Sequence, residues 1–99
     1  MSSVFVYQFW NPDCRPCAVL KPMFGVMAED FADSVTWVSV NTHNDTNGYK
    51  DTYGVTVVPT LVTVIRDAAG NDIKINRHSG SSVPEYYHLV RVAVMESKQ

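Results

Sequence analysis

Residues 4–20 read V-F-V-Y-Q-F-W-N-P-D-C-R-P-C-A-V-L, an apolar run that passes through a short break into a helical pattern. Residues 4–9 are β-branched or aromatic at nearly every position, which predicts an inner strand covered on both faces. The Asn-Pro-Asp sequence at 11–13 interrupts this strand. Cys14 and Cys17 therefore fall between the end of a strand and the first turn of a helix.

The helix that follows is predicted over about residues 15–32, where apolar side chains recur with helical spacing. Pro22 lies inside it and should kink it, because proline removes one backbone donor and clashes with the preceding turn. The expected buried stripe consists of Val19, Leu20, Met23, Phe24, Met27, Ala28 and Phe31.

The remaining chain continues the alternation of strands and helices. Residues 35–40 (V-T-W-V-S-V) predict a second strand, and the polar stretch 43–53 has room for one short helix. Residues 57–65 and 72–77 predict two further strands, joined as a hairpin by the turn residues at 67–71.

A last helix is predicted from the spacing of Ser82 and Glu85, which is that of a capping box, with Pro84 in the first turn. It should run to about Ser97, with Tyr86, Leu89, Val90, Ala93 and Val94 facing inward. The order of elements predicts a single α/β domain over residues 1–99, a four-stranded mixed sheet with helices on both faces.

The composition narrows the range of functions. Apolar residues make up 45% of the chain and charged residues 18%, with a formal net charge of −2. This is typical of a globular protein, and the scattered basic residues give no reason to expect nucleic-acid binding. No targeting pattern or membrane-spanning apolar run is found. We therefore expect a monomeric cytoplasmic protein that does not contact membranes.

The two cysteines are the strongest candidates for chemistry. A disulfide between them would close a very small loop, so stabilisation is a weak reason for the pair. Cys14 falls at the helix N-terminus, where free N–H groups and the helix dipole stabilise a thiolate. Cys17 follows one turn later, placed to resolve a mixed disulfide formed on Cys14. This pattern predicts a thiol–disulfide oxidoreductase that needs no cofactor beyond the redox-active Cys14–Cys17 disulfide.

Three neighbours of Cys14 should tune its reactivity. Arg15 favours the thiolate, whereas the carboxylate of Asp13 opposes it. Pro16 tolerates its missing donor in the first helical turn and stiffens the loop.

Other interpretations of these residues are weaker. A CxxC pair is half of a zinc site, but the chain has no second pair, and its histidines lack ligand spacing. We therefore expect no metal and assign these histidines to solvated surface: His43, His78 and His88. Trp37, Tyr86, Tyr87, Met23 and Met27 are expected to serve packing.

Taken together, the motifs resemble the thioredoxin family. W-x-x-x-C-x-P-C follows an apolar strand, a proline lies five residues past the second cysteine, and Y-G-V-x-x-V-P-T occupies 53–60. The similarity extends from about residue 4 to residue 97. It implies a thioredoxin fold shortened at its N-terminus, because the family's first strand and helix have no counterpart here. The matching positions are Trp10, Cys14, Pro16, Cys17, Pro22, Tyr53, Gly54, Pro59, Thr60 and Gly80.

The resemblance also implies roles for the groove. Pro59 should follow a cis peptide bond and lie against the cysteines, and Val58 should offer backbone hydrogen bonds to an extended substrate. Trp10 and Gly80 should border this groove. Implied partners are proteins with reducible disulfides, and a thioredoxin reductase or small thiol as the electron source.

Two positions depart from the family. Gln8 replaces the family's buried aspartate beneath the cysteines, and Ser39 replaces its lysine partner. A neutral amide cannot act as a base, so Cys17 must lose its proton to water or another neighbour. Two other functions stay open: a glutaredoxin-like electron donor, for instance to a ribonucleotide reductase, and a non-enzymatic thioredoxin-fold subunit that stabilises another protein.

Overall fold

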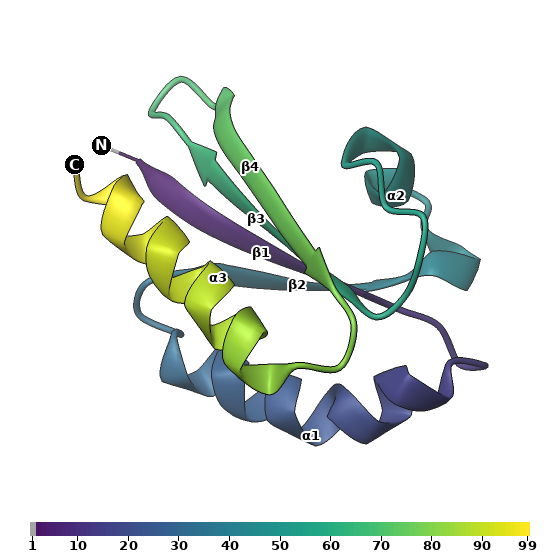
Figure 1. Ribbon diagram of the computed structural model, residues 1–99. Helices are drawn as coiled ribbons and strands as arrows, with labels where there is room; N and C mark the ends of the chain where they lie inside the picture. The colour runs from purple at the N-terminus through teal and green to yellow at the C-terminus, as the bar shows by residue number, and fades with distance from the viewer. Residues whose placement is uncertain (1) are drawn as a thin grey trace.

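The computed structural model describes residues 2–99. Along the chain, the elements are β1 (Ser3–Trp10), α1 (Arg15–Asp30), β2 (Thr36–Asn41), a 3₁₀ turn (Thr42–Asn44), α2 (Tyr49–Thr52), β3 (Thr60–Arg66), β4 (Asp72–Ser79) and α3 (Val83–Ser97), as Figure 1 shows.

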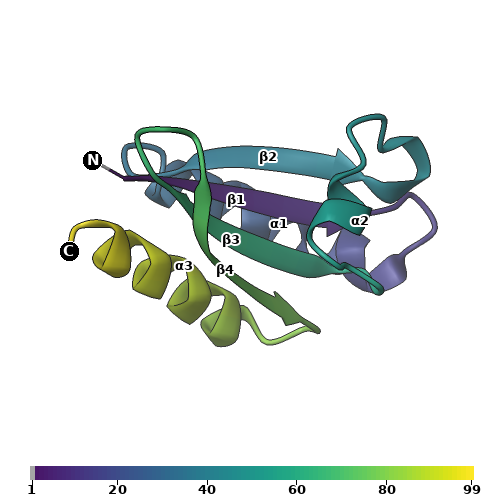
Figure 2. The same cartoon turned by 90° about the horizontal axis from the view of Figure 1, so that it is seen from above.

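The four strands form one mixed sheet in the order β2-β1-β3-β4. β1 is parallel to β2 and antiparallel to β3, which is antiparallel to β4. α1 and α3 lie on one face of the sheet and α2 on the other (Figures 1 and 2). The predicted thioredoxin fold, with its four-stranded mixed sheet and helices on both faces, is therefore confirmed.

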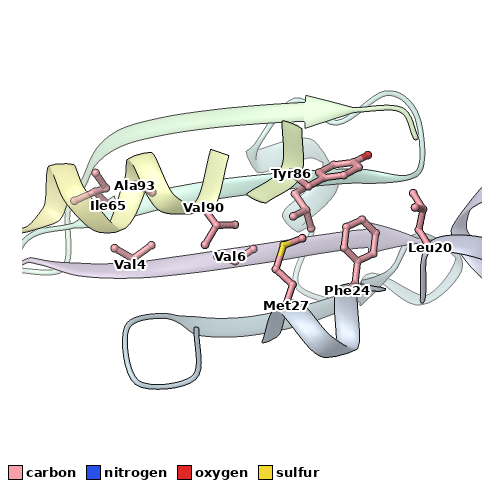
Figure 3. Close-up of a cluster of buried hydrophobic side chains, with 10 residues drawn as sticks. Val4, Val6, Leu20, Phe24, Met27, Ile65, Tyr86, Val90 and Ala93 are labelled. Atoms are coloured by element: carbon pink, nitrogen blue, oxygen red, sulfur yellow. The ribbon is translucent and has the colours of Figure 1, made fainter. Parts of the chain in front are cut away.

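One hydrophobic cluster lies between the sheet and the helices α1 and α3 (Figure 3). The ring of Phe24 on α1 meets that of Tyr86 on α3 edge to face, with centroids 5.0 Å apart. These helices are amphipathic, so their burial against the sheet is the main source of their stability. The buried members are Val4, Val6, Leu20, Phe24, Met27, Leu61, Ile65, Tyr86, Val90 and Ala93.

A second cluster covers the opposite face. Tyr7 and Phe9 of β1 point into it, whereas Val4 and Val6 of the same strand point into the first cluster. β1 is therefore buried on both faces, as its nearly continuous apolar sequence predicts. The buried members of the second cluster are Tyr7, Phe9, Val40, Tyr53, Val55, Val62 and Val64.

Several sequence-based expectations are corrected. Val19 and Met23 are 68% and 37% exposed, because α1 meets the sheet along a narrower stripe than predicted. β3 begins at Thr60 rather than at residue 57, since Pro59 has no N–H to donate to a strand ladder. Ser82 occupies the cap of α3, but its side chain makes no capping bond.

A cap side chain accepts from the N–H groups of the second or third helical residue. Pro84 removes the first of these donors, whereas the N–H of Glu85 is present but is not bonded by the Ser82 side chain. α1, in turn, continues through Pro22 as an unbroken helix to Asp30.

Within residues 2–99, no helix combines the length and hydropathy needed to cross a membrane.

Candidate active site

The cysteine pair lies at the start of α1, as predicted. Cys14 is the N-cap residue with extended backbone angles, and Cys17 lies in the first turn. The two form a disulfide, with their Cα atoms 5.2 Å apart. The Cys17 N–H donates to Cys14 Sγ at 3.2 Å. This sulfur therefore occupies the place where a helix N-terminus stabilises an anion.

The two sulfurs differ in their access to solvent. Cys17 is buried, with 5% of its surface exposed, whereas Cys14 is half-buried. An attacking thiol must be reachable by its target, and a resolving thiol need only reach its partner. The asymmetry agrees with Cys14 as the attacking residue.

The loop before Cys14 is held by Asn11. Its Oδ1 accepts from the Asp13 N–H at 2.9 Å, and its backbone oxygen accepts from the Cys14 N–H at 3.3 Å. The side chain of Asp13 is 86% exposed, with Oδ2 3.8 Å from His43 Nδ1. Water therefore screens the effect of this carboxylate on Cys14.

His43 is exposed, as expected, but its approach to Asp13 was not foreseen. Arg15 and Pro16, the other predicted tuning residues, are also exposed in the first turn.

Gln8 lies in the same pocket as both cysteines, with Ser39 as its partner on β2. Each side chain accepts a hydrogen bond from a tryptophan indole: Trp37 Nε1 donates to Gln8 Oε1 at 2.9 Å, and Trp10 Nε1 donates to Ser39 Oγ at 2.8 Å. The structure thus places a neutral pair where the family resemblance puts a charged one. Trp37, assigned to packing, contacts the core and also orients Gln8.

The pocket has a volume of about 550 Å³. Among the described residues that line it, the only ionisable side chain apart from the cysteines is Lys21. No carboxylate is therefore positioned there to accept the proton of Cys17. No group of three or more His, Cys, Asp or Glu suited to a metal is found in residues 2–99.

The remaining predicted site residues come together at the same end of the sheet. Thr60 pairs with Phe9 in β1 and with Ser79 in β4, so Pro59 and Gly80 lie at the end where β1 runs toward α1 (Figure 1). The Val58–Pro59 peptide bond is cis. None of the three residues Val58, Pro59 and Gly80 lines the pocket that contains the cysteines.

Tyr86 joins the two loops. Its fully buried hydroxyl lies 2.5 Å from the Gly80 oxygen and 3.3 Å from the Pro59 oxygen, and the Gly80 N–H donates to the Pro59 oxygen at 3.4 Å. A phenol has one hydrogen to donate, so the shorter contact identifies Gly80 as its acceptor. Tyr86 was expected only to pack. The signal that could have shown more is that a buried tyrosine hydroxyl needs a partner.

Replacing Tyr86 with phenylalanine should lower the free energy of unfolding by about 1 kcal/mol, the usual net value of one hydrogen bond. Burial raises the pKa of Tyr86 from 10.0 to about 12. The unfolded chain ionises this phenol more easily, so wild-type stability should fall as pH rises from 10 toward 12. Urea unfolding at several alkaline pH values should show a smaller fall in the variant. Tyr53, whose pKa burial also raises, remains in both proteins. Identical pH profiles would contradict the assignment.

Comparison with known proteins gives consistent matches. A family model described as "Thioredoxin" matches residues 1–83. The M-type chloroplastic thioredoxin of Zea mays is 36% identical over 55 residues, which cover 56% of this chain and 32% of the relative. The match thus spans about a third of the length of that curated relative.

Solved structures show the same fold. The Trx4 domain of ERdj5 superposes with a TM-score of 0.76 at 17% identity, covering 95% of this chain and 82% of that one. The complex of ferredoxin:thioredoxin reductase with thioredoxin f2 contains a chain that matches with a TM-score of 0.74 at 18% identity, covering 92% and 77%.

Proposed function

Since this chain belongs to the thioredoxin family, we propose that it reduces protein disulfides by dithiol exchange through Cys14 and Cys17. The observation that carries this proposal is the placement of the pair: a disulfide at a helix N-terminus, with the first sulfur accessible and the second buried. The first gives a stabilised thiolate, and the second gives a protected resolving group.

The exchange has two steps. In the reduced protein, the Cys14 thiolate attacks one sulfur of the substrate disulfide; a mixed disulfide forms, and the other substrate sulfur leaves as a thiolate. Cys17 then loses its proton and attacks Cys14 Sγ, so that the Cys14–Cys17 bond forms and the second substrate sulfur leaves. The substrate gains two electrons, which a reductase or small thiol must later return to the protein.

The proton of Cys17 needs an acceptor other than Gln8, because a neutral amide is not a base. The departing substrate thiolate and water are the available acceptors. We expect the attack of Cys17 on the mixed disulfide, which requires the loss of this proton, to depend on pH more strongly than the first attack by the Cys14 thiolate.

The substrate would lie along Val58, Pro59 and Gly80 and extend to Trp10. Support comes from their common position at one end of the sheet and from two hydrogen bonds that connect the loops: Tyr86 donates to the Gly80 oxygen, and the Gly80 N–H donates to the Pro59 oxygen. The electron donor would be a thioredoxin reductase or a small thiol; one chain of similar fold comes from the complex of ferredoxin:thioredoxin reductase with thioredoxin f2. We further propose a single domain acting as a monomer. A cytoplasmic location stays a prediction, and the maize relative is chloroplastic.

An insulin reduction assay tests the proposal. The protein is supplied either with thioredoxin reductase and NADPH or with glutathione and its reductase, and the turbidity of the released insulin chain is followed. A variant with both cysteines replaced by serine provides the baseline. Turnover with thioredoxin reductase supports the proposal, whereas turnover with glutathione alone indicates a glutaredoxin-like donor. Baseline rates with both would contradict disulfide reduction and favour a binding subunit.

A further inference from the structure

The pocket beside the disulfide has the size and walls of a small-molecule site. Its volume of about 550 Å³ falls within the range of ligand pockets, which are mostly apolar with a few placed polar groups. It lies between one flank of α1 and the neighbouring strands β1 and β2. Its aromatic walls are Trp10, Phe24 and Trp37.

The helix flank that faces this space carries small residues. Ala18, Gly25 and Ala28 line it together with Lys21. Gly25 lies in the interior of α1, where glycine is less favourable than alanine. A Cβ at this position would meet no heavy atom within 4 Å. Core packing therefore does not require a glycine here, and its effect is to widen the pocket.

Three side-chain oxygens in the pocket accept hydrogen bonds from nearby N–H groups. An indole N–H can only donate, so Gln8 must present Oε1 to Trp37, and Ser39 presents Oγ to Trp10. Likewise, Asn11 must present Oδ1 to the Asp13 N–H. Each of these side-chain oxygens thus already accepts one hydrogen bond.

What remains is a set of donors. The Nε2 of Gln8, the Nδ2 of Asn11 and the hydroxyl hydrogen of Ser39 have no acceptor among residues 2–99. Lys21 adds a positive charge and forms no ion pair within the described chain. No aspartate or glutamate lines the pocket. These donors and Lys21 therefore favour a ligand that offers acceptors and negative charge beside a flat apolar body.

From this we propose that the pocket binds a small aromatic carboxylate, separately from the disulfide exchange proposed above. The aromatic body would lie among the two indoles and the small face of α1, with the carboxylate accepting from the free donors and Lys21. Charged hydrogen bonds of this kind are stronger than neutral ones. Because both cysteines also line the pocket, the ligand would lie next to the redox pair.

Two-dimensional ¹H–¹⁵N NMR of the oxidised protein tests this directly. The chain has two tryptophans, both in the pocket wall, so both indole N–H signals report on occupancy. The probe is 2-naphthoate, and the matched control is (2-naphthyl)methylammonium, which has the same ring system and the opposite charge. We expect saturable shifts of both signals with a Kd of about 1 mM or below, and binding of the cation at least about tenfold weaker.

Two variants locate the site. Gly25→Leu should fill the pocket and weaken naphthoate binding more than about tenfold, while helix propensity keeps the protein folded; its thermal unfolding is measured alongside. Lys21→Gln should weaken binding about two- to fivefold, as expected for one exposed charge, and Lys98→Gln should leave it unchanged. Equal binding of both probes, wild-type affinity in Gly25→Leu, or absence of saturable shifts would overturn the proposal. None of these readouts depends on disulfide reduction.

Discussion

Replacement of Cys14 by serine is expected to lower the rate of insulin reduction by roughly a thousandfold or more. A serine hydroxyl at this position is neither ionised at neutral pH nor able to form a mixed disulfide. The remaining Cys17 is 5% exposed, so it cannot readily take over the attack on a protein substrate. The rate is measured with saturating reductase, so that reduction of the Cys14–Cys17 disulfide does not limit it.

The matched variant, Cys17→Ser, should behave differently. Cys14 still attacks, but no second thiol resolves the product, so mixed disulfides accumulate. Non-reducing gels and mass spectrometry should show these adducts in Cys17→Ser and not in Cys14→Ser. Equal trapping by both variants would show that the two sulfurs do not have distinct roles. In the reduced wild-type protein, iodoacetamide should accordingly modify Cys14 before Cys17.

Much of the fold could be predicted because local patterns and tertiary structure agree. The apolar run of β1 requires cover on two faces, and the structure provides it through two separate clusters. The placement of Cys14 follows from a strand, a Pro-containing break and an amphipathic helix in succession. The cis bond before Pro59 followed from family resemblance, since V-P-T by itself is also compatible with an ordinary strand entry.

The missed features depend on contacts between residues distant in sequence. Gln8 and Trp37 lie 29 residues apart, as do Trp10 and Ser39, and no local pattern pairs an indole with a particular oxygen. The pocket arises because short side chains from α1 meet these pairs across the edge of the sheet. Its unpaired donors can be identified only when the hydrogen bonds of the neighbouring oxygens are known.

The second large effect is expected from Gln8→Asp, which places an ionisable group in the pocket that both cysteines line. Partial burial should raise the pKa of the new carboxyl. When folding raises the pKa of a carboxyl group, the protein keeps its full free energy of unfolding below the unfolded-state pKa of about 3.9. It loses stability as the pH rises through the higher folded-state pKa, because the unfolded chain ionises the group more easily. A shift of one to two units corresponds to a loss of about 1.4–2.7 kcal/mol at neutral pH.

Gln8→Asn is the matched control for this variant. Asn is as short as Asp, so both variants weaken the hydrogen bond from Trp37, but only Asp can ionise. Urea unfolding between pH 4 and pH 9 should therefore give a pH-dependent difference between the two variants. Adding Ser39→Lys to Gln8→Asp should recover part of the lost stability, because the two positions are register partners on adjacent strands. A double-mutant cycle measures this coupling.

The same carboxylate should separate the two steps of the reaction. Its negative charge opposes formation of the Cys14 thiolate, so the apparent pKa of that thiol should rise relative to the wild type. It also supplies the base that the pocket otherwise lacks, so Cys17 should resolve a trapped mixed disulfide faster. Stopped-flow measurement of each step shows whether attack slows while resolution accelerates. If Gln8→Asp and Gln8→Asn have the same rates and the same unfolding profile with pH, the new carboxyl is fully hydrated, and a carboxylate at position 8 does not act as a base for Cys17.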